Sequence, residues 1–112
     1  MIYHICTQKD WEDSQGEEVY RAESLKSEGF IHCSTFNQVE RVLNTFYRGQ
    51  KDLVLLAIDP THLVSKVKWE PGLDKPDELF PHIFGSINLD AISTVIKIEQ
   101  YQKGNFDYLA IK

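Results

Sequence analysis

The sequence predicts a single α+β domain with a curved, largely antiparallel β-sheet and one main amphipathic helix. Three observations support this prediction. Short β-prone stretches recur along the 112 residues, a length typical of one domain. Only one stretch has a clear helical spacing of apolar side chains. The chain contains no internal repeat and no low-complexity tract, so we expect residues 1–112 to form a single domain.

The first half of the chain predicts an opening strand and the main helix. Residues 2–6 are apolar and β-prone, and the polar side chain of His4 shares a face with their apolar side chains. Thr7 is expected to cap a short helix that follows this strand. Residues 35–38 have the form of a capping box, and the helix behind them has apolar residues at helical spacing: Phe36, Val39, Val42, Leu43 and Phe46.

The second half of the chain predicts most of the sheet. Residues 53–58 are continuously apolar, which is typical of a central strand covered on both faces. Residues 67–70 predict another strand, and residues 71–78 are rich in turn formers and charge, so we expect a mobile loop beside the site. Residues 93–101 alternate like a half-exposed antiparallel strand, and residues 106–111 predict a hairpin partner for it.

Composition limits the classes of protein to which this chain can belong. Its net charge of −5 argues against a non-specific nucleic-acid binder, which would usually carry a basic patch. Cys6 and Cys33 lie on predicted strands and are expected to be buried free thiols, and Trp69 is expected in the core. Residues 1–6 lack the basic start of a signal peptide. No segment approaches the roughly 20 apolar residues of a membrane helix, so we expect a cytoplasmic protein.

Two stretches carry polar side chains where a buried strand would usually be apolar. The first ends at the start of the main helix, and its His32 and Ser34 share one face of the strand. The second lies far along the chain, where His82 and Phe84 share a face and Gly85 allows a backbone or ligand to approach closely. We expect the two stretches to meet and to form a polar site.

Each of these residues has a functional and a structural interpretation. His32 precedes a helix N-terminus, where a phosphate or a dinucleotide diphosphate is favoured; alternatively it is a buried histidine bonded to a carbonyl. Ser34 binds a ligand or caps the helix. Phe84 stacks on a base or nicotinamide ring, or belongs to the core. Glu70 is a general base or an acceptor for a ribose hydroxyl, or else a surface charge.

A metal site is not expected. The chain has histidine and cysteine side chains that would suit zinc. However, His32 and Cys33 point to opposite faces of one strand and cannot bind the same ion. The CxxC and HxxxH spacings that would indicate a metal site are also missing.

Four motifs, in this order, resemble a family of small, mainly bacterial proteins known as a domain of unknown function: GFIHCS at 29–34, LVLLAID at 53–59, WE at 69–70 and FPHIFG at 80–85. The resemblance covers nearly the whole chain. Known structures of that family are classified with the ADP-ribosyltransferase-like fold, related to NAD-using transferases and tRNA 2′-phosphotransferases. Some members carry a glutathione transferase label, but this sequence has no thioredoxin-like pattern. The resemblance implies a split, curved β-sandwich with a cleft for NAD or a related nucleotide.

The resemblance also implies roles for individual residues. Transferases of that fold hold the nicotinamide nucleotide with a His or Arg on an early strand, a Ser or Tyr on a second strand and often a Glu on a later one. By position, His4 or His32 corresponds to the first, Ser34 to the second and Glu70 to the third.

Two functional hypotheses follow, together with a weaker third. The first is an ADP-ribosyltransferase-like enzyme that binds NAD or a phosphorylated nucleotide, with catalytic residues His32, Glu70 and His82 and cofactor-binding residues His32, Ser34, Phe84 and Gly85. The second is a non-catalytic module that binds a small ligand or a protein on the same fold. The third is a metal-dependent hydrolase. The sequence leaves the substrate, the partner and the oligomeric state open.

Overall fold

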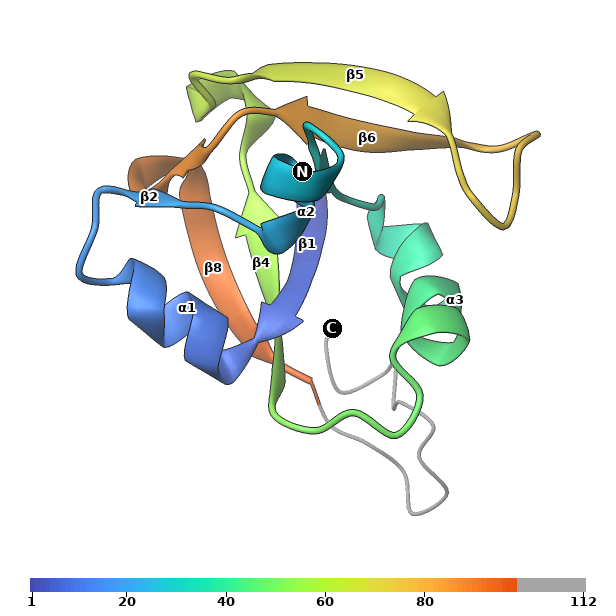
Figure 1. The fold of residues 1–112 in the computed structure, drawn as a ribbon, viewed down its shortest axis with the longest axis horizontal. Coiled ribbons are helices and arrows are strands. Elements are labelled where there is room, and N and C mark those ends of the chain that lie inside the picture. The colour runs from blue at the N-terminus through green and yellow to red at the C-terminus, as the bar shows by residue number, and fades with distance from the viewer. Residues whose placement is uncertain (99–112) are drawn as a thin grey trace.

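The computed structural model describes residues 1–98 as an α+β fold built on antiparallel sheets (Figure 1). One three-stranded sheet has the order β1–β4–β8, formed by Ile2–Thr7, Leu53–Ile58 and Ile92–Lys97. A second has the order β3–β6–β5, formed by Ile31–His32, Leu79–Phe84 and Lys66–Pro71. The short strands β2 and β7, Val19–Tyr20 and Ile87–Asn88, form a two-stranded sheet.

Two of the helices begin where the sequence places their caps. Helix α1 spans Gln8–Ser14, and the Thr7 hydroxyl accepts a hydrogen bond from the Asp10 N–H, as predicted. Helix α2 spans Glu23–Ser27, and the longest helix, α3, spans Phe36–Phe46. At the start of α3 the Gln38 side chain accepts a hydrogen bond from the Thr35 N–H, which confirms the predicted capping box. Two single turns of 3-10 helix, η1 and η2, span Pro60–His62 and Leu89–Ala91.

Strand β4 separates two apolar clusters, and this explains why all six of its residues are buried. Successive side chains of a strand point to opposite faces. Leu53 and Leu55 therefore face helix α3, whose Val39 and Leu43 are completely buried against them. Three alternate residues face the β3–β6 pair and the β2–β7 sheet: Val54, Leu56 and Ile58. The prediction of a central strand covered on both faces is confirmed.

The two larger sheets are joined where β1 passes β3. Tyr3 and Ser34 exchange both backbone hydrogen bonds, Tyr3 N–H to Ser34 O and Ser34 N–H to Tyr3 O, each 2.8 Å long. This isolated bridge holds the end of β3 against the first strand. It positions the chain between the sheets immediately before helix α3 begins.

Some expectations from the sequence were wrong in detail. Trp69, expected in the core, is 50% exposed, because β5 is an edge strand and the apolar cluster that Val67 reaches does not extend to this ring on the same face. The strand expected over residues 30–34 pairs only as Ile31–His32, because Ser34 leaves β6 to bridge Tyr3. The expected last strand at 106–111 lies outside the described residues. Within residues 1–98, no helix is long and apolar enough to cross a membrane.

Replacing Leu56 with alanine should destabilise the fold strongly. Leu56 lies on the central strand β4 and its side chain is fully buried in the cluster with Ile31 and Ile83, so truncation leaves a cavity that costs about 2–5 kcal/mol of unfolding free energy. Urea denaturation followed by circular dichroism measures this loss. Val64→Ala is the control, because Val64 is 87% exposed and its truncation should change stability by less than about 0.5 kcal/mol. Equal effects of the two changes would contradict the assignment of the core.

Candidate functional site

The two polar stretches meet as neighbouring strands. β3 pairs with β6 so that His32 lies directly opposite His82, and the centroids of their rings are 5.3 Å apart. Phe30, immediately before β3, stacks on the His82 ring at a centroid distance of 4.2 Å and an interplanar angle of 19°. The structure therefore brings His32 and His82 together on one face of the β3–β6 pair.

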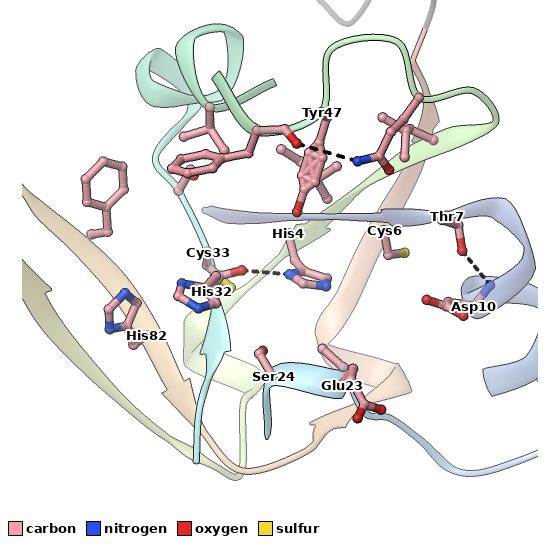
Figure 2. Close-up of a pocket in the computed structure, with 18 of the residues that line it drawn as sticks. His4, Cys6, Thr7, Asp10, Glu23, Ser24, His32, Cys33, Tyr47 and His82 are labelled. Atoms are coloured by element: carbon pink, nitrogen blue, oxygen red, sulfur yellow. Dashed lines mark hydrogen bonds between the residues drawn. The ribbon is translucent and has the colours of Figure 1, made fainter. Parts of the chain in front are cut away.

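A pocket of about 500 Å³ opens beside these histidines. Its wall includes side chains from β1, β3 and β6, among them His4, His32 and His82 (Figure 2). Apolar and aromatic side chains form much of the remaining wall: Val42, Phe46, Tyr47, Leu53, Leu73 and Phe80. The pocket thus lies where the two larger sheets and helix α3 come together.

His4 joins the two sides of the pocket through hydrogen bonds at both ring nitrogens. Its Nδ1 lies 2.7 Å from the His32 carbonyl oxygen, and its Nε2 lies 2.9 Å from the Tyr20 hydroxyl. Burial lowers the pKa of His4 to about 4, so the ring is neutral at pH 7. Since a carbonyl can only accept, Nδ1 carries the proton and the Tyr20 hydroxyl donates to Nε2.

The two cysteines are free and buried, as the sequence predicts. Burial raises the pKa of the Cys6 thiol to about 12. Burial also raises the pKa of Cys33, which packs among the apolar side chains beneath β3. Both thiols are therefore protonated at neutral pH and are poor nucleophiles.

Two carboxylates bind the paired histidines. Glu70 on β5 lies 2.8 Å from Nδ1 of His82, measured from its Oε1, and Glu28 lies 3.0 Å from Nε2 of His32, measured from its Oε2. His82 is buried, whereas the side chains of Glu70 and His32 are partly exposed. Glu70, which the sequence left between a functional role and a surface charge, thus contacts a predicted site residue.

The remaining predicted site residues divide between the pocket and its surroundings. Ser34 is buried and lines the pocket, while Thr35 takes the helix-capping position. Phe84 lies outside the described lining, 5.3 Å from the Phe30 ring and under the Lys68 ammonium. Gly85 also lies outside it, and a Cβ there would overlap the Ser65 hydroxyl, so close packing accounts for this glycine.

The loop between β5 and β6 is tied to the start of helix α3. The Gln38 amide donates to the Glu78 carboxylate at 2.8 Å and to the Leu79 carbonyl at 3.0 Å, and Arg41 also donates to Glu78. The hydrogen bond from Arg41 holds the pKa of Glu78 below its ordinary value. These contacts hold the end of the loop whose Leu73 and Asp74 contribute to the pocket wall.

Sequence reasoning did not identify three residues that shape the site: Tyr20, Phe30 and Glu28. Tyr20 bonds His4 across 16 positions of sequence, and Phe30 stacks on a residue 52 positions away, so both contacts depend on the tertiary fold. Glu28 could have been found, because it lies four positions before His32.

Metal ligation finds no support in the arrangement of side chains. Among residues 1–98, no group of three or more His, Cys, Asp and Glu side chains is placed to hold a metal ion. Each of the three pocket histidines instead has a hydrogen-bond partner within the protein.

Residues 5–95 match the family described as "Protein of unknown function (DUF952)". The chain belongs to this family. No curated protein matches the sequence significantly.

The fold is shared with solved structures of the protein CC0527 from Caulobacter crescentus. One crystal structure is 24% identical with a TM-score of 0.84, and it covers 95% of this chain and 92% of that one. The solution NMR structure is 25% identical with a TM-score of 0.78, covering 92% and 88%. This likeness supports the α+β architecture described above.

The buried His4 should make stability fall as the pH falls. Its pKa is 6.5 in the unfolded chain and about 4 in the folded one, so the unfolded state binds the proton first. The stabilising contribution is complete above pH 6.5 and is lost toward pH 4, by about 3 kcal/mol. Urea denaturation at several pH values between 7.5 and 4.5 measures it.

His4→Gln is the informative variant for this prediction. A glutamine can still donate to the His32 carbonyl and accept from Tyr20 but does not titrate, so its stability should vary less with pH in this range. His62→Gln is the matched control, because the His62 side chain is 65% exposed, and it should keep the wild-type pH dependence. An unchanged pH dependence in His4→Gln would show that another group is responsible.

Proposed function

We propose that the pocket binds the nicotinamide–ribose end of NAD or of a related nucleotide, on an ADP-ribosyltransferase-like fold. The resemblance of the GFIHCS and FPHIFG motifs to their family supports this fold. The arrangement of two antiparallel sheets with a pocket beside them is compatible with it. Fold alone does not establish function, so the proposal depends on the pocket itself.

The observation that carries the proposal is the volume of the pocket together with the kinds of side chain that line it. A volume of about 500 Å³ falls within the range of roughly 300–1,000 Å³ that is typical of small-molecule sites. Aromatic side chains such as Tyr47 and Phe80 suit a flat ring, and the polar groups of His32, Ser34 and His82 lie together in the wall. Apolar walls with a few grouped polar atoms are the usual design of a ligand pocket.

The charges of the lining indicate which end of a nucleotide would enter. The described lining contains the carboxylates of Asp10, Glu23 and Asp74 but no Lys or Arg. Negative potential favours the cationic nicotinamide ring and disfavours a diphosphate. We therefore place the ring inside the pocket and the phosphates in solvent, which revises the expectation of a phosphate beside His32.

Transferase chemistry is a second step of the proposal. In ribosyl transfer, the bond between the ribose and nicotinamide breaks with its electron pair leaving on nicotinamide. An acceptor hydroxyl then bonds to the ribose carbon and loses its proton. His32 is the group proposed to take that proton, while the neighbouring His82, held by Glu70, contacts the nicotinamide. The catalytic roles of these three residues remain predictions.

Binding of nicotinamide riboside and NAD should shift backbone amide signals in NMR spectra. The affected residues should be those of the wall at 31–34 and 80–82, because they line or adjoin the pocket. ADP-ribose has the phosphates but lacks nicotinamide, so it should leave these signals unchanged. Titration to millimolar concentration with each compound provides the measurement.

Two variants test whether the effect arises in the pocket. His32→Ala should weaken nicotinamide riboside binding about tenfold, equivalent to about 1.4 kcal/mol. His62→Ala should not, because His62 is an exposed histidine outside the described lining. If ADP-ribose shifts the wall signals and nicotinamide riboside does not, the charge argument is wrong. If none of the compounds shifts them, the pocket is not a nucleotide site.

A further inference from the structure

His82 is held in one orientation by two contacts. Its Nδ1 lies 2.8 Å from the Glu70 carboxylate, which reaches it diagonally from the neighbouring strand β5. The Phe30 ring lies almost parallel to the imidazole and covers one of its faces. An ionised carboxylate can only accept hydrogen bonds, so Nδ1 carries a proton. The Glu70 contact therefore selects the tautomer, and Phe30 fixes the plane of the ring.

The second ring nitrogen of His82 has no hydrogen-bond partner among the described residues. Within residues 1–98, the structure gives Nε2 no hydrogen-bond partner, although the His82 side chain is only 6% exposed. Nevertheless, Nε2 is not among the fully enclosed polar atoms of this region that lack a partner. His82 is one of the residues that line the pocket, so a ligand bound there lies close to this ring. Buried polar atoms are nearly always hydrogen-bonded, so we expect this nitrogen to bond to water or to a ligand in the pocket.

The other histidines differ from His82 in this respect. Both nitrogens of His4 are bonded within the protein, to the His32 carbonyl and the Tyr20 hydroxyl. His32 has a carboxylate partner, Glu28, but its side chain is 40% exposed and water can satisfy it. His62 is still more exposed. His82 alone among the four combines burial, a carboxylate partner, a place in the pocket lining and a ring nitrogen without a partner among the described residues.

We propose that, in the neutral form of its ring, His82 keeps its proton on Nδ1 against Glu70, presents Nε2 to the pocket as an acceptor, and so selects ligands that donate a hydrogen bond at this point. This inference rests on the proposed function and specifies it further. A neutral imidazole with its proton on Nδ1 is an acceptor at Nε2. The amide group of nicotinamide can donate to such an acceptor. The carboxylate of nicotinic acid cannot, and it would also face the three carboxylates of the lining.

Glu70 and Phe30 are positioning residues in this proposal. Neither needs to touch the ligand, because each acts through the His82 ring. Removing the Glu70 carboxylate frees Nδ1, and the ring can then place its proton on Nε2. The acceptor at the pocket wall would become a donor, and the preference for an amide over a carboxylate would decrease.

The first experiment measures the tautomer in the protein without ligand. Long-range proton–nitrogen NMR spectra at pH 8 should show His82 protonated on Nδ1 and bare on Nε2. Glu70→Ala should move the proton toward Nε2, whereas Glu70→Gln should restore the wild-type tautomer, because the glutamine oxygen can also accept from Nδ1. A wild-type ring protonated on Nε2 would overturn the proposal, whatever the protein binds.

The second experiment compares nicotinamide riboside with nicotinic acid riboside by calorimetric titration at the same pH. The wild-type protein should bind the amide at least tenfold more tightly, and Glu70→Ala should reduce this ratio at least threefold. Glu40→Ala is the control, because it removes an exposed carboxylate outside the described lining and should leave the ratio unchanged. Backbone amide spectra of each variant establish that it is folded.

The outcomes separate this proposal from the function on which it rests. If neither riboside binds, the nicotinamide site is wrong, and the ring spectra still decide the state of His82. If both bind the wild type equally, or if Glu70→Ala keeps the full preference for the amide, selection by the Glu70–His82 pair is wrong although the pocket binds nucleosides. The proposal is supported if Nε2 carries no proton and if the ratio of the affinities for the two ribosides decreases in Glu70→Ala.

Discussion

The hydrogen bond from the His4 ring to the His32 carbonyl is the contact on which the site depends, because it crosses between the two larger sheets. His4 belongs to β1, and His32 belongs to β3 of the other sheet. The adjacent backbone bridge between Tyr3 and Ser34 reinforces the same junction. A neutral imidazole suits this position, because it donates to the carbonyl at one nitrogen and accepts from Tyr20 at the other. One buried side chain thus sets the spacing of the strands that frame the pocket.

The short strand β3 serves the core and the site at once. Ile31 is completely buried beneath the sheet, and the next residue, His32, faces the site beside His82. Because strand side chains alternate between faces, the same two residues anchor the strand and present the imidazole. A shift of one residue in the β3–β6 register would bury His32 and expose Ile31. The packing of Ile31 against Ile83 therefore fixes the register that aligns the two histidines.

Sequence patterns anticipate those parts of the structure that depend on local periodicity. The buried run of β4, the capping box of α3 and the alternation around His32 all follow from side chains within a few positions of one another. The prediction that Trp69 is buried was wrong because an apolar residue gives the same sequence pattern on a central strand and on an edge strand of a sheet. The bonds of His4 to Tyr20 and of His82 to Glu70 could not be read from the sequence, since each depends on which strands become neighbours.

The position of Glu78 shows how residues, and not the fold, decide what such a pocket accepts. A helix start beside a histidine suggests a place for a phosphate. In this chain, Gln38 and Arg41 on the first turns of α3 instead bind the protein's own Glu78 carboxylate. The positive charge of Arg41 is thereby paired within the protein and does not attract an anionic ligand. The carboxylates of Asp10, Glu23 and Asp74 make the pocket lining acidic. In the binding mode proposed above, a nucleotide places its cationic, hydrogen-bond-donating end against His82 and leaves its phosphates in water.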